Sequence, residues 1–299
     1  MTIFRADQKK QLQKGLNAVV GLEYREWDKA WTDIFDEEQS DQAYEEDVMM
    51  AGTGAASVKG EGAAVQYDDM YETYTARYQH STVAIAVSIT EEAVEDNLYL
   101  SMGSKIARSA TRSMMYTQEV RRANILNYGF DSNFAGGDGV ELLSTAHPLG
   151  GGGTLSNTLA TPAQLSESSM EELSIQVSKW TDERGIPVKC SIKKLLIPTD
   201  LQFVAARLLM TPYQPDTGDN NINAMFKLGT IENGFSVNRY LTDPAKWFFK
   251  TDIPDGLKAF SRRPLKKALE GEFETGNLRM KLSMRYSEGW TNPRGIAGS

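Results

Sequence analysis

The chain has 299 residues, 40% of them hydrophobic and 24% charged, as expected for a globular protein of one or two domains. Its net charge of −8 argues against a specific nucleic-acid-binding protein, and only residues 262–267 form a locally basic run. Cys190 is the single cysteine, which excludes an intrachain disulfide framework and fits a reducing compartment. No apolar run approaches the roughly 18 residues of a membrane-spanning helix, and the N-terminus lacks the apolar core of a signal peptide.

The first part of the chain predicts helix and then an extended arm. Apolar residues recur at helical spacing within residues 4–30, and Gly21 suggests a break into two helices. Residues 36–65 are acidic and then rich in glycine and alanine, with no sustained period. This segment is either a disordered linker or an arm that lies on another surface, since Tyr44, Val48, Met49 and Met50 are scattered through it. Its acidic part lacks the pattern of a calcium loop.

Residues 65–89 alternate with a period of two, which predicts two strands. In the first run, tyrosines alternate with polar residues up to His80. In the second run, β-branched residues alternate with small ones from Val83 to Ile89. We expect these runs to form one long β-hairpin, and because a two-stranded ribbon is marginal alone, it needs a surface to lie on.

Residues 89–128 predict one helix of roughly 38 residues, with Ser88 or Thr90 as its cap and Ser88 and Glu91 at capping-box spacing. Its apolar residues step by four, which overshoots a helical turn by about 40°, so the stripe winds around the helix. A winding stripe favours a spine that different elements contact along its length; the alternative is an ordinary bundle helix. The stripe consists of Val94, Leu98, Met102, Ile106, Ala110 and Met114.

The second half predicts a compact arrangement of helices and strands. Gly150–Gly153 lack the lysine and the strand–helix context of a phosphate loop, so we expect a flexible surface loop. The remaining patterns predict helices at 166–184 and 200–210, strands at 194–198, 235–241 and 247–249, a polar loop at 212–223, and an alternating stretch at Leu278, Met280, Leu282 and Met284.

No motif for catalysis or metal binding stands out. His80, His147 and Cys190 are far apart in the sequence and offer no zinc-ligand spacing. A Cys–His nucleophile pair is possible in principle, but Cys190 lies beside an expected buried strand and fits a small buried hydrophobe better. No G-x-S-x-G elbow occurs, and 40 carboxylates make chance pairs unavoidable. We therefore expect a non-enzyme with no catalytic, cofactor-binding or metal-binding residues.

Several segments, in order, resemble the major capsid proteins of tailed bacteriophages, and more specifically the major head subunits of Mu-like phages. They are AYEEDVMMAGTG, EGAAVQYDDMYETYTARYQH, ITEEAVEDNLY, LLSTAHPLGGGGTLSN, DERGIPVKCSIKKLLIPTDLQFVAARLL, NRYLTDPAKWFF and LRMKLSMRYSEGWTNPRGIAGS. The resemblance covers nearly the whole chain. It implies an α+β Hong Kong 97-type capsid fold with an N-terminal arm, an extended β-hairpin loop (E-loop), a long spine helix, a peripheral domain and an axial domain.

The resemblance also implies a division of the chain. The expected parts are an N-terminal arm at 1–55, the E-loop at 56–88, a peripheral domain with the spine at 89–160, an axial domain at 161–250, and return strands to the peripheral domain at 251–299.

The implied function is self-assembly, as hexamers and pentamers, into an icosahedral shell that encloses double-stranded DNA without specific recognition. The shell would be the virion capsid, assembled in the cytoplasm of the host bacterium. Its partners would be portal, scaffold and possibly decoration or cement proteins, without a membrane. The candidate subunit-contact residues are Tyr44, Met49, Tyr67, Tyr71, Tyr74 and Tyr78.

Two further expectations and two alternatives follow from the resemblance. Lys59, at the base of the hairpin, is the only lysine near it, so we expect no lysine–asparagine cross-link. Because the arm begins almost at Met1, we expect a separate scaffold protein. The alternatives are an encapsulin-type nanocompartment shell and a soluble α/β enzyme that uses Cys190 or a carboxylate pair.

Overall fold

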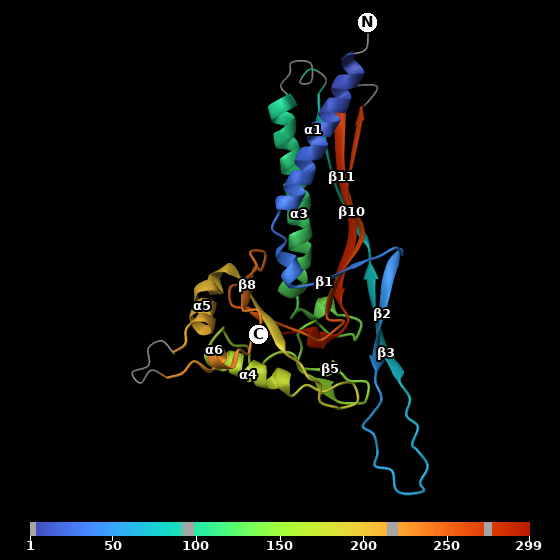
Figure 1. The fold of residues 1–299 in the computed structure, drawn as a ribbon, viewed down its shortest axis with the longest axis vertical. Helices are drawn as coiled ribbons and strands as arrows, with labels where there is room; N and C mark the ends of the chain where they lie inside the picture. Colours follow the sequence, from blue (N-terminus) through green and yellow to red (C-terminus); the bar gives the residue numbers. More distant parts are fainter. Residues whose placement is uncertain (1–3, 91, 93–98, 214–220, 272–276) are drawn as a thin grey trace.

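A computed structural model describes residues 4–90, 92, 99–213, 221–271 and 277–299. Figure 1 shows three parts: a tall column of two helices beside long strands, a rounded lobe at the foot of the column, and a hairpin at its side that ends in a long loop. None of the helices in these ranges is both long and apolar enough to cross a bilayer.

The column joins two helices to a four-stranded sheet. The helices are α1 (Phe4–Glu26) and α3 (Tyr99–Asn127). The strands follow the order β1 (Asp36–Gln39), β10 (Leu257–Gly271), β11 (Leu278–Trp290) and β4 (Ser81–Ile89), with β1 parallel to β10 and the other pairs antiparallel. Alternate apolar side chains of β11 face the helices, as the alternating pattern predicted. They form one core with residues of α1 and α3, including Leu16, Val20, Ala107, Met114, Leu282 and Tyr286.

Both helix boundaries at the start of the column differ from expectation. The break near Gly21 is wrong, because α1 runs through it; a glycine costs a helix about 1 kcal/mol, which packing against α3 can offset. The helix start at Ile89 is also wrong, because β4 extends to Ile89 and pairs with β11 there. Ser88 is therefore a strand residue and not a helix cap. Glu91 and residues 93–98, with Val94 and Leu98, lie outside the described residues.

The spine interpretation is confirmed over the described part of α3. The upper part of the helix packs on α1 and β11 through Ala110 and Met114. The lower end packs through Leu126 against a different core, which includes Trp31 of the 3-10 helix η1 (Ala30–Asp33) and Phe248 of the lobe. Different elements therefore contact α3 along its length.

The pairing of the hairpin was predicted incorrectly. β3 (Tyr71–Gln79) does not pair with β4; it pairs with β2 (Tyr44–Ala51), while β4 joins the column sheet. A single residue, His80, separates β3 from β4, whereas hairpin turns usually need two or more residues. Two parts of the predicted arm thus lie on other strands of the same chain, as one alternative held: β1 on β10 and β2 on β3. Residues 55–65 of the arm are exposed and lie on no such surface.

The lobe contains a second four-stranded sheet, in the order β12 (Ile296–Gly298), β9 (Phe248–Thr251), β7 (Ile192–Ile197) and β8 (Phe235–Val237). Helices α4 (Glu167–Ser178), α5 (Gln202–Met210) and α6 (Ala224–Leu228) accompany it, and η3 (Thr199–Leu201) leads into α5. The predicted strands and helices are confirmed in type. Helix α4 ends at Ser178 and not Arg184, because Thr181 bridges to Pro187; α6 and much of β10 were not predicted.

The glycine run forms the turn between β5 (His147–Pro148) and β6 (Thr154–Leu155). Gly152 and Gly153 both have φ of 92°, a region that favours glycine. The N–H groups of Gly150 and Gly151 donate to the side chain and the backbone carbonyl of Glu183. These N–H groups are bound within the chain, so the structure supports the rejection of a phosphate loop.

Candidate assembly surfaces

The tyrosines of β3 anchor the hairpin to its own chain. Tyr78 is only 3% exposed, packs edge-on against Phe260, and donates its hydroxyl to Thr291 Oγ1 at 2.5 Å. The hydroxyl of Tyr74 donates to the Thr291 carbonyl at 2.7 Å. Burial raises the pKa of Tyr78, so its hydroxyl stays protonated and available as a donor. This burial leaves Tyr78 no free surface for a neighbouring subunit.

A charged contact fixes the hairpin strand β2 next to these tyrosines. Asp47 Oδ2 accepts from Lys258 Nζ at 2.6 Å and from Thr291 Oγ1 at 2.9 Å. Burial alone would lower the pKa of Lys258, but its bonds to Asp255 and Asp47 raise it above the ordinary value. The ammonium group is therefore held charged, and the root of the hairpin is firmly attached to the column.

The base of the loop between β2 and β3 is closed by a second charged contact. Arg184 Nη2 lies 2.6 and 2.8 Å from the two carboxylate oxygens of Asp68, which also accepts the Gly54 N–H at 2.6 Å. The Gly54 bond and the Arg184 ion pair both lower the pKa of Asp68. These bonds join the two limbs of the loop and tether them to the lobe.

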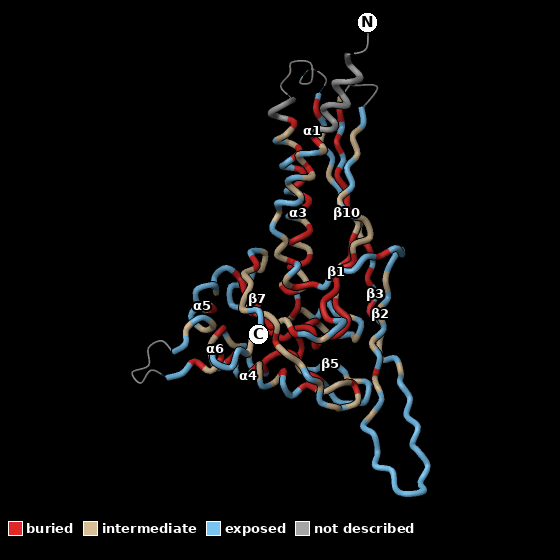
Figure 2. Tube along the Cα trace, in the orientation of Figure 1, coloured by how far each residue is buried: buried red, intermediate tan, exposed pale blue. Residues whose placement is uncertain are grey.

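Beyond this tether, the loop has no surface of its own to lie on. Every residue from 55 to 70 is exposed, and Figure 2 shows this stretch as a pale loop extending from the body. Its large apolar side chains are among the most exposed in the described chain: Val58 100%, Tyr67 97%, Val65 65% and Met70 58%. Of the other predicted contact residues, Tyr44 is exposed, whereas Met49 and Tyr71 are half-buried. Exposed apolar groups of this kind mark interaction surfaces.

A second exposed apolar surface lies on the lobe, on α5, α6 and the adjoining segments. This surface could not be predicted from the sequence, because its residues border a polar loop and show no period of their own. It is formed by Phe203, Met210, Tyr213, Ile222, Phe226 and Leu228, whose exposures range from 41% for Phe226 to 79% for Leu228.

The third surface is the basic face of the column sheet. Arg279, Lys281 and Arg285 alternate with buried apolar residues on β11, so they project from the face opposite to the helices. The register places Arg263 opposite Arg285 and Lys266 opposite Ser283, on the same face, and Glu270 opposite Arg279 adds a carboxylate to it. The sequence showed no concentration of basic residues on one face, and the structure corrects that interpretation. The alternation of cations on β11 was the signal that could have revealed it.

The residues considered for catalysis occupy three separate sites. Burial raises the pKa of the Cys190 thiol to about 12, which makes it a poor nucleophile. His80 is buried between the hydroxyls of Ser40, at 2.8 Å, and Ser287, at 3.0 Å. Within the described ranges, no group of three or more His, Cys, Asp or Glu side chains is placed to hold a metal ion.

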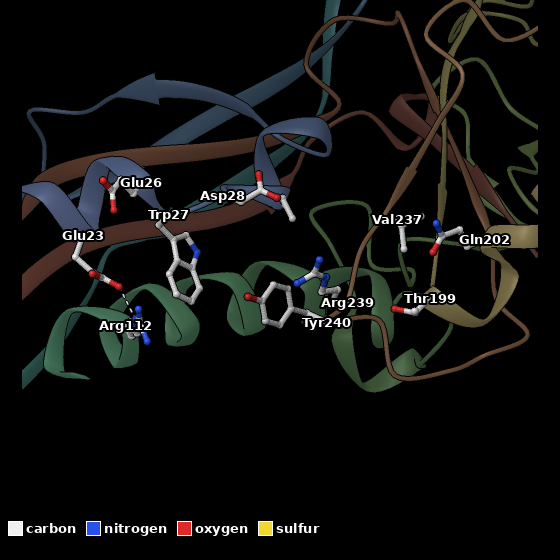
Figure 3. A pocket seen from close by; sticks show the side chains of 11 residues that line it. Glu23, Glu26, Trp27, Asp28, Arg112, Thr199, Gln202, Val237, Arg239 and Tyr240 are labelled. Atoms are coloured by element: carbon white, nitrogen blue, oxygen red, sulfur yellow. Dashed lines mark hydrogen bonds and ion pairs between the residues drawn. The ribbon is translucent and has the colours of Figure 1, made fainter. Parts of the chain in front are cut away.

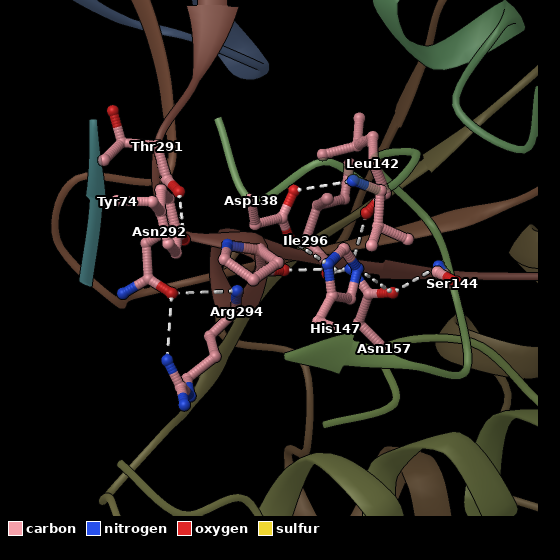
Figure 4. Close-up of polar contacts among 12 residues, drawn as sticks. Tyr74, Asp138, Leu142, Ser144, His147, Asn157, Thr291, Asn292, Arg294 and Ile296 are labelled. Atoms are coloured by element: carbon pink, nitrogen blue, oxygen red, sulfur yellow. Dashed lines mark hydrogen bonds and ion pairs between the residues drawn. The ribbon is translucent and has the colours of Figure 1, made fainter. Parts of the chain in front are cut away.

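His147 belongs to a buried polar network that ties the lobe to the last residues of the chain (Figure 4). Its Nδ1 lies 2.6 Å from Asp138 Oδ2, and its Nε2 lies 3.2 Å from Asn157 Oδ1. The Asn157 amide donates to the carbonyls of Leu142, Pro293 and Ile296. Because His147 is only 1% exposed, this arrangement stabilises the fold and offers no open site.

Comparisons with known proteins find structural similarity over most of the chain but no match in sequence. No family model matches the chain, and no curated protein matches it in sequence. Among solved structures, a virus-like particle from Pyrococcus furiosus aligns with a TM-score of 0.53 and 10% identity over 95% of this chain and 98% of that one. A chain from Mycobacterium phage Che8 gives 0.52 and 12% over 91% and 92%. The holo-SrpI encapsulin complex from Synechococcus elongatus gives 0.53 and 12% over 92% and 88%. The chain therefore has the α+β Hong Kong 97-type capsid fold, as predicted.

Proposed function

We propose that the chain is a self-assembling shell protein, and specifically the major capsid protein of a tailed bacteriophage of the Mu-like group. Many copies form hexamers and pentamers that close into an icosahedral virion capsid around double-stranded DNA. The observation that supports this best is the loop at residues 55–70. Its apolar side chains are exposed throughout, on a fold that the chain shares with shell-forming proteins.

The three exposed surfaces suggest how copies meet. Tyr67 and Tyr44 of the hairpin contact a neighbouring subunit, with Met49, Tyr71 and Tyr74 at the edge of that contact. The apolar surface on α5 and α6 packs against its counterparts around the local axes. In both cases association covers apolar area that one chain leaves in water.

Charge complementarity suggests where the hairpin lies. The outer part of the hairpin carries the exposed carboxylates Glu61, Asp69 and Glu72, and the sheet face of the column carries Lys266 and Lys281. We infer that the hairpin of one copy crosses the basic sheet face of the next, where attraction between opposite charges aids encounter and register.

The division of the chain follows the same proposal. With the proposed borders at 55, 88, 160 and 250, the peripheral domain takes α3 of the column together with the return strands β10 and β11, and the axial domain takes α4, α5, α6, β7 and β8 of the lobe. The column also includes α1 and β4, which belong to the proposed arm and E-loop segments. Portal, scaffold and decoration proteins are the proposed partners, and assembly takes place in the cytoplasm of the host bacterium.

Electron microscopy of the purified chain after size-exclusion chromatography tests the proposal. Closed icosahedral particles, or rings of five and six subunits, are the expected result. A monodisperse 33.2 kDa species that never assembles, even at high concentration, would contradict it.

Charge reversal tests the hairpin contact separately. Lys266→Glu with Lys281→Glu should lower the yield of particles at least about tenfold, and Glu61→Lys with Asp69→Lys should restore part of it. Lys179→Glu at the end of α4 is the matched control, because this exposed lysine lies in the lobe, outside both the sheet face and the α5–α6 surface. Equal yields from the double variant and the control would exclude the proposed contact.

An encapsulin-type shell remains the second candidate, because the encapsulin aligns with this chain as well as the phage chain does. The contents of native particles distinguish the two. Nuclease-protected DNA supports the phage capsid, whereas a copurifying enzyme in fixed ratio supports the nanocompartment.

A further inference from the structure

Glu119 of α3 is a buried carboxyl group that no described residue pairs fully. The residue is 1% exposed, and neither carboxylate oxygen has a well-formed hydrogen bond to a described residue, although the Trp31 backbone N–H and the Trp27 indole lie close enough to favour the ionised form. Buried carboxyl groups are normally paired, because removing the charge from water is costly. The position of Glu119 at the junction of three elements makes this exception informative.

Each of the three elements brings a polar group to Glu119. The connection between α1 and η1 brings the Trp27 indole, whose N–H is also unpaired among the described residues, together with Asp28. The segment that follows β8 brings the Tyr240 hydroxyl, whose pKa is raised by burial and by the charge of Glu119. Helix α3 itself supplies Arg122.

Arg122 does not neutralise Glu119 alone. It is fully buried, its guanidinium stacks 3.6 Å from the centre of the Trp31 ring, and none of its nitrogens is hydrogen-bonded within the described residues. Its positive charge also interacts with Glu288 and Glu37. Glu288 is also paired with Arg121 at 2.9 Å, so Arg122 divides its charge mainly between Glu119 and Glu37 and neutralises neither fully.

These opposing interactions leave the pKa of Glu119 near neutral pH. Burial raises its pKa to about 7, although the Trp31 N–H, the Trp27 indole and Arg122 act in the opposite direction. The neutral and ionised forms thus exchange near physiological pH, and burial without a full partner costs the ionised form far more than the neutral form.

A solvent-accessible groove lies beside this junction. A groove of about 680 Å³ opens beside it, between the α1–η1 connection and the lobe (Figure 3). Trp27 and Asp28 line one wall, and Arg239 and Tyr240 line the other. Outward movement of the Trp27 segment would connect Glu119 with this groove.

We propose that Glu119 is a proton-controlled latch: in its neutral form it seats the α1–η1 connection against α3 and the Tyr240 segment, and its ionisation releases that connection. The proposal concerns one chain and does not depend on shell formation. The region that responds is residues 27–35, with the Tyr240 segment facing it across the groove.

Hydrogen exchange of the full chain tests the latch. Protection factors, corrected for chemical exchange, are measured at about pH 5.5 and about pH 8.5. The expected result is a loss of protection of at least about tenfold in residues 27–35 at the higher pH, with no change in strand β7 of the lobe core. Equal protection at both pH values, or a uniform loss across the chain, would overturn the proposal whatever any variant does.

Two variants test whether the pH response of residues 27–35 comes from Glu119. Glu119→Gln should keep residues 27–35 protected at both pH values, because it cannot ionise. Glu23→Gln is the matched control: Glu23 lines the same groove but is paired with Arg112, so the pH response should persist. A pH response that survives in Glu119→Gln would assign it to another group and refute the latch.

Discussion

Residues 290–299 and residues 55–70 show opposite relations between composition and burial. The first segment, WTNPRGIAGS, contains the polar residues Thr291, Asn292, Arg294 and Ser299, yet every residue in it is buried. The second contains Val58, Val65, Tyr67 and Met70, yet every residue in it is exposed. The polar side chains of the first segment have hydrogen-bond partners in the hairpin and the lobe, whereas the large apolar side chains of the second have no surface within their own chain. Burial here depends on the available partners and not on hydropathy alone.

The largest loss of stability is expected from a substitution at Arg294, in the buried segment. Arg294→Met leaves Glu183 charged and unpaired in a site where both side chains are at most 4% exposed, and the expected loss of stability is about 3–5 kcal/mol. Thermal unfolding measures it. The double variant with Glu183→Gln should recover much of the loss. Arg112→Met, which removes a pair whose arginine is 64% exposed, should cost about 1 kcal/mol at most.

The two ends of the hairpin should respond differently to the same truncation. Tyr78→Ala removes a buried ring and should lower the free energy of unfolding by about 3–5 kcal/mol. Tyr67→Ala removes a ring that is 97% exposed and should change it by less than about 0.5 kcal/mol, while lowering the yield of particles. Denaturant unfolding and particle yield, measured together, separate the two roles. A large stability loss in Tyr67→Ala would show that the loop is bound within its own chain.

Burial of Glu119 makes the free energy of unfolding depend on pH. Its pKa rises from 4.5 to about 7 on folding, so the unfolded chain releases the proton first. The contribution of Glu119 to stability should be complete below about pH 4.5, fall by about 3 kcal/mol as the pH rises to about 7, and then level off. Glu119→Gln should remove this fall, which denaturant titrations at several pH values would detect. A parallel pH profile in the variant would show that another group is responsible.

The smallest effect is expected at the tether of the loop. Arg184→Gln removes the ion pair with Asp68, both partners of which are partly exposed, so the melting temperature should not change measurably. Hydrogen exchange at residues 52–54 should become faster, because Gly54 depends on the same carboxylate. Unchanged exchange there would mean that the Gly54 bond alone closes the loop.

The sequence was most informative where one segment carries its own pattern. The alternation from Leu278 to Met284 predicted β11, and the helical spacing of apolar residues that begins at Ser166 predicted α4. Strand pairing was not predictable in the same way, because β2 and β3 are separated by a loop without any period. Most of β10 was obscured by Pro264 and the basic run around it.

The candidate surfaces were only partly predictable for a related reason. Tyr67 and Tyr78 look alike in the sequence, and only the position of Thr291 and Phe260, more than 180 residues away, separates an anchor from an exposed contact. The basic sheet face joins cations from two strands, so no single stretch of sequence contains it.

The single residue between β3 and β4 has a mechanical consequence. His80 joins the hairpin and the column sheet almost end to end, and its ring is held between Ser40 and Ser287. A pull on the loop is therefore carried as tension along the backbone into β4, whose nine residues pair with β11. Such a load acts along the strand and strains all the hydrogen bonds between β4 and β11 together, instead of opening them one after another. The loop can therefore bear more tension than if it were attached at one end of a strand.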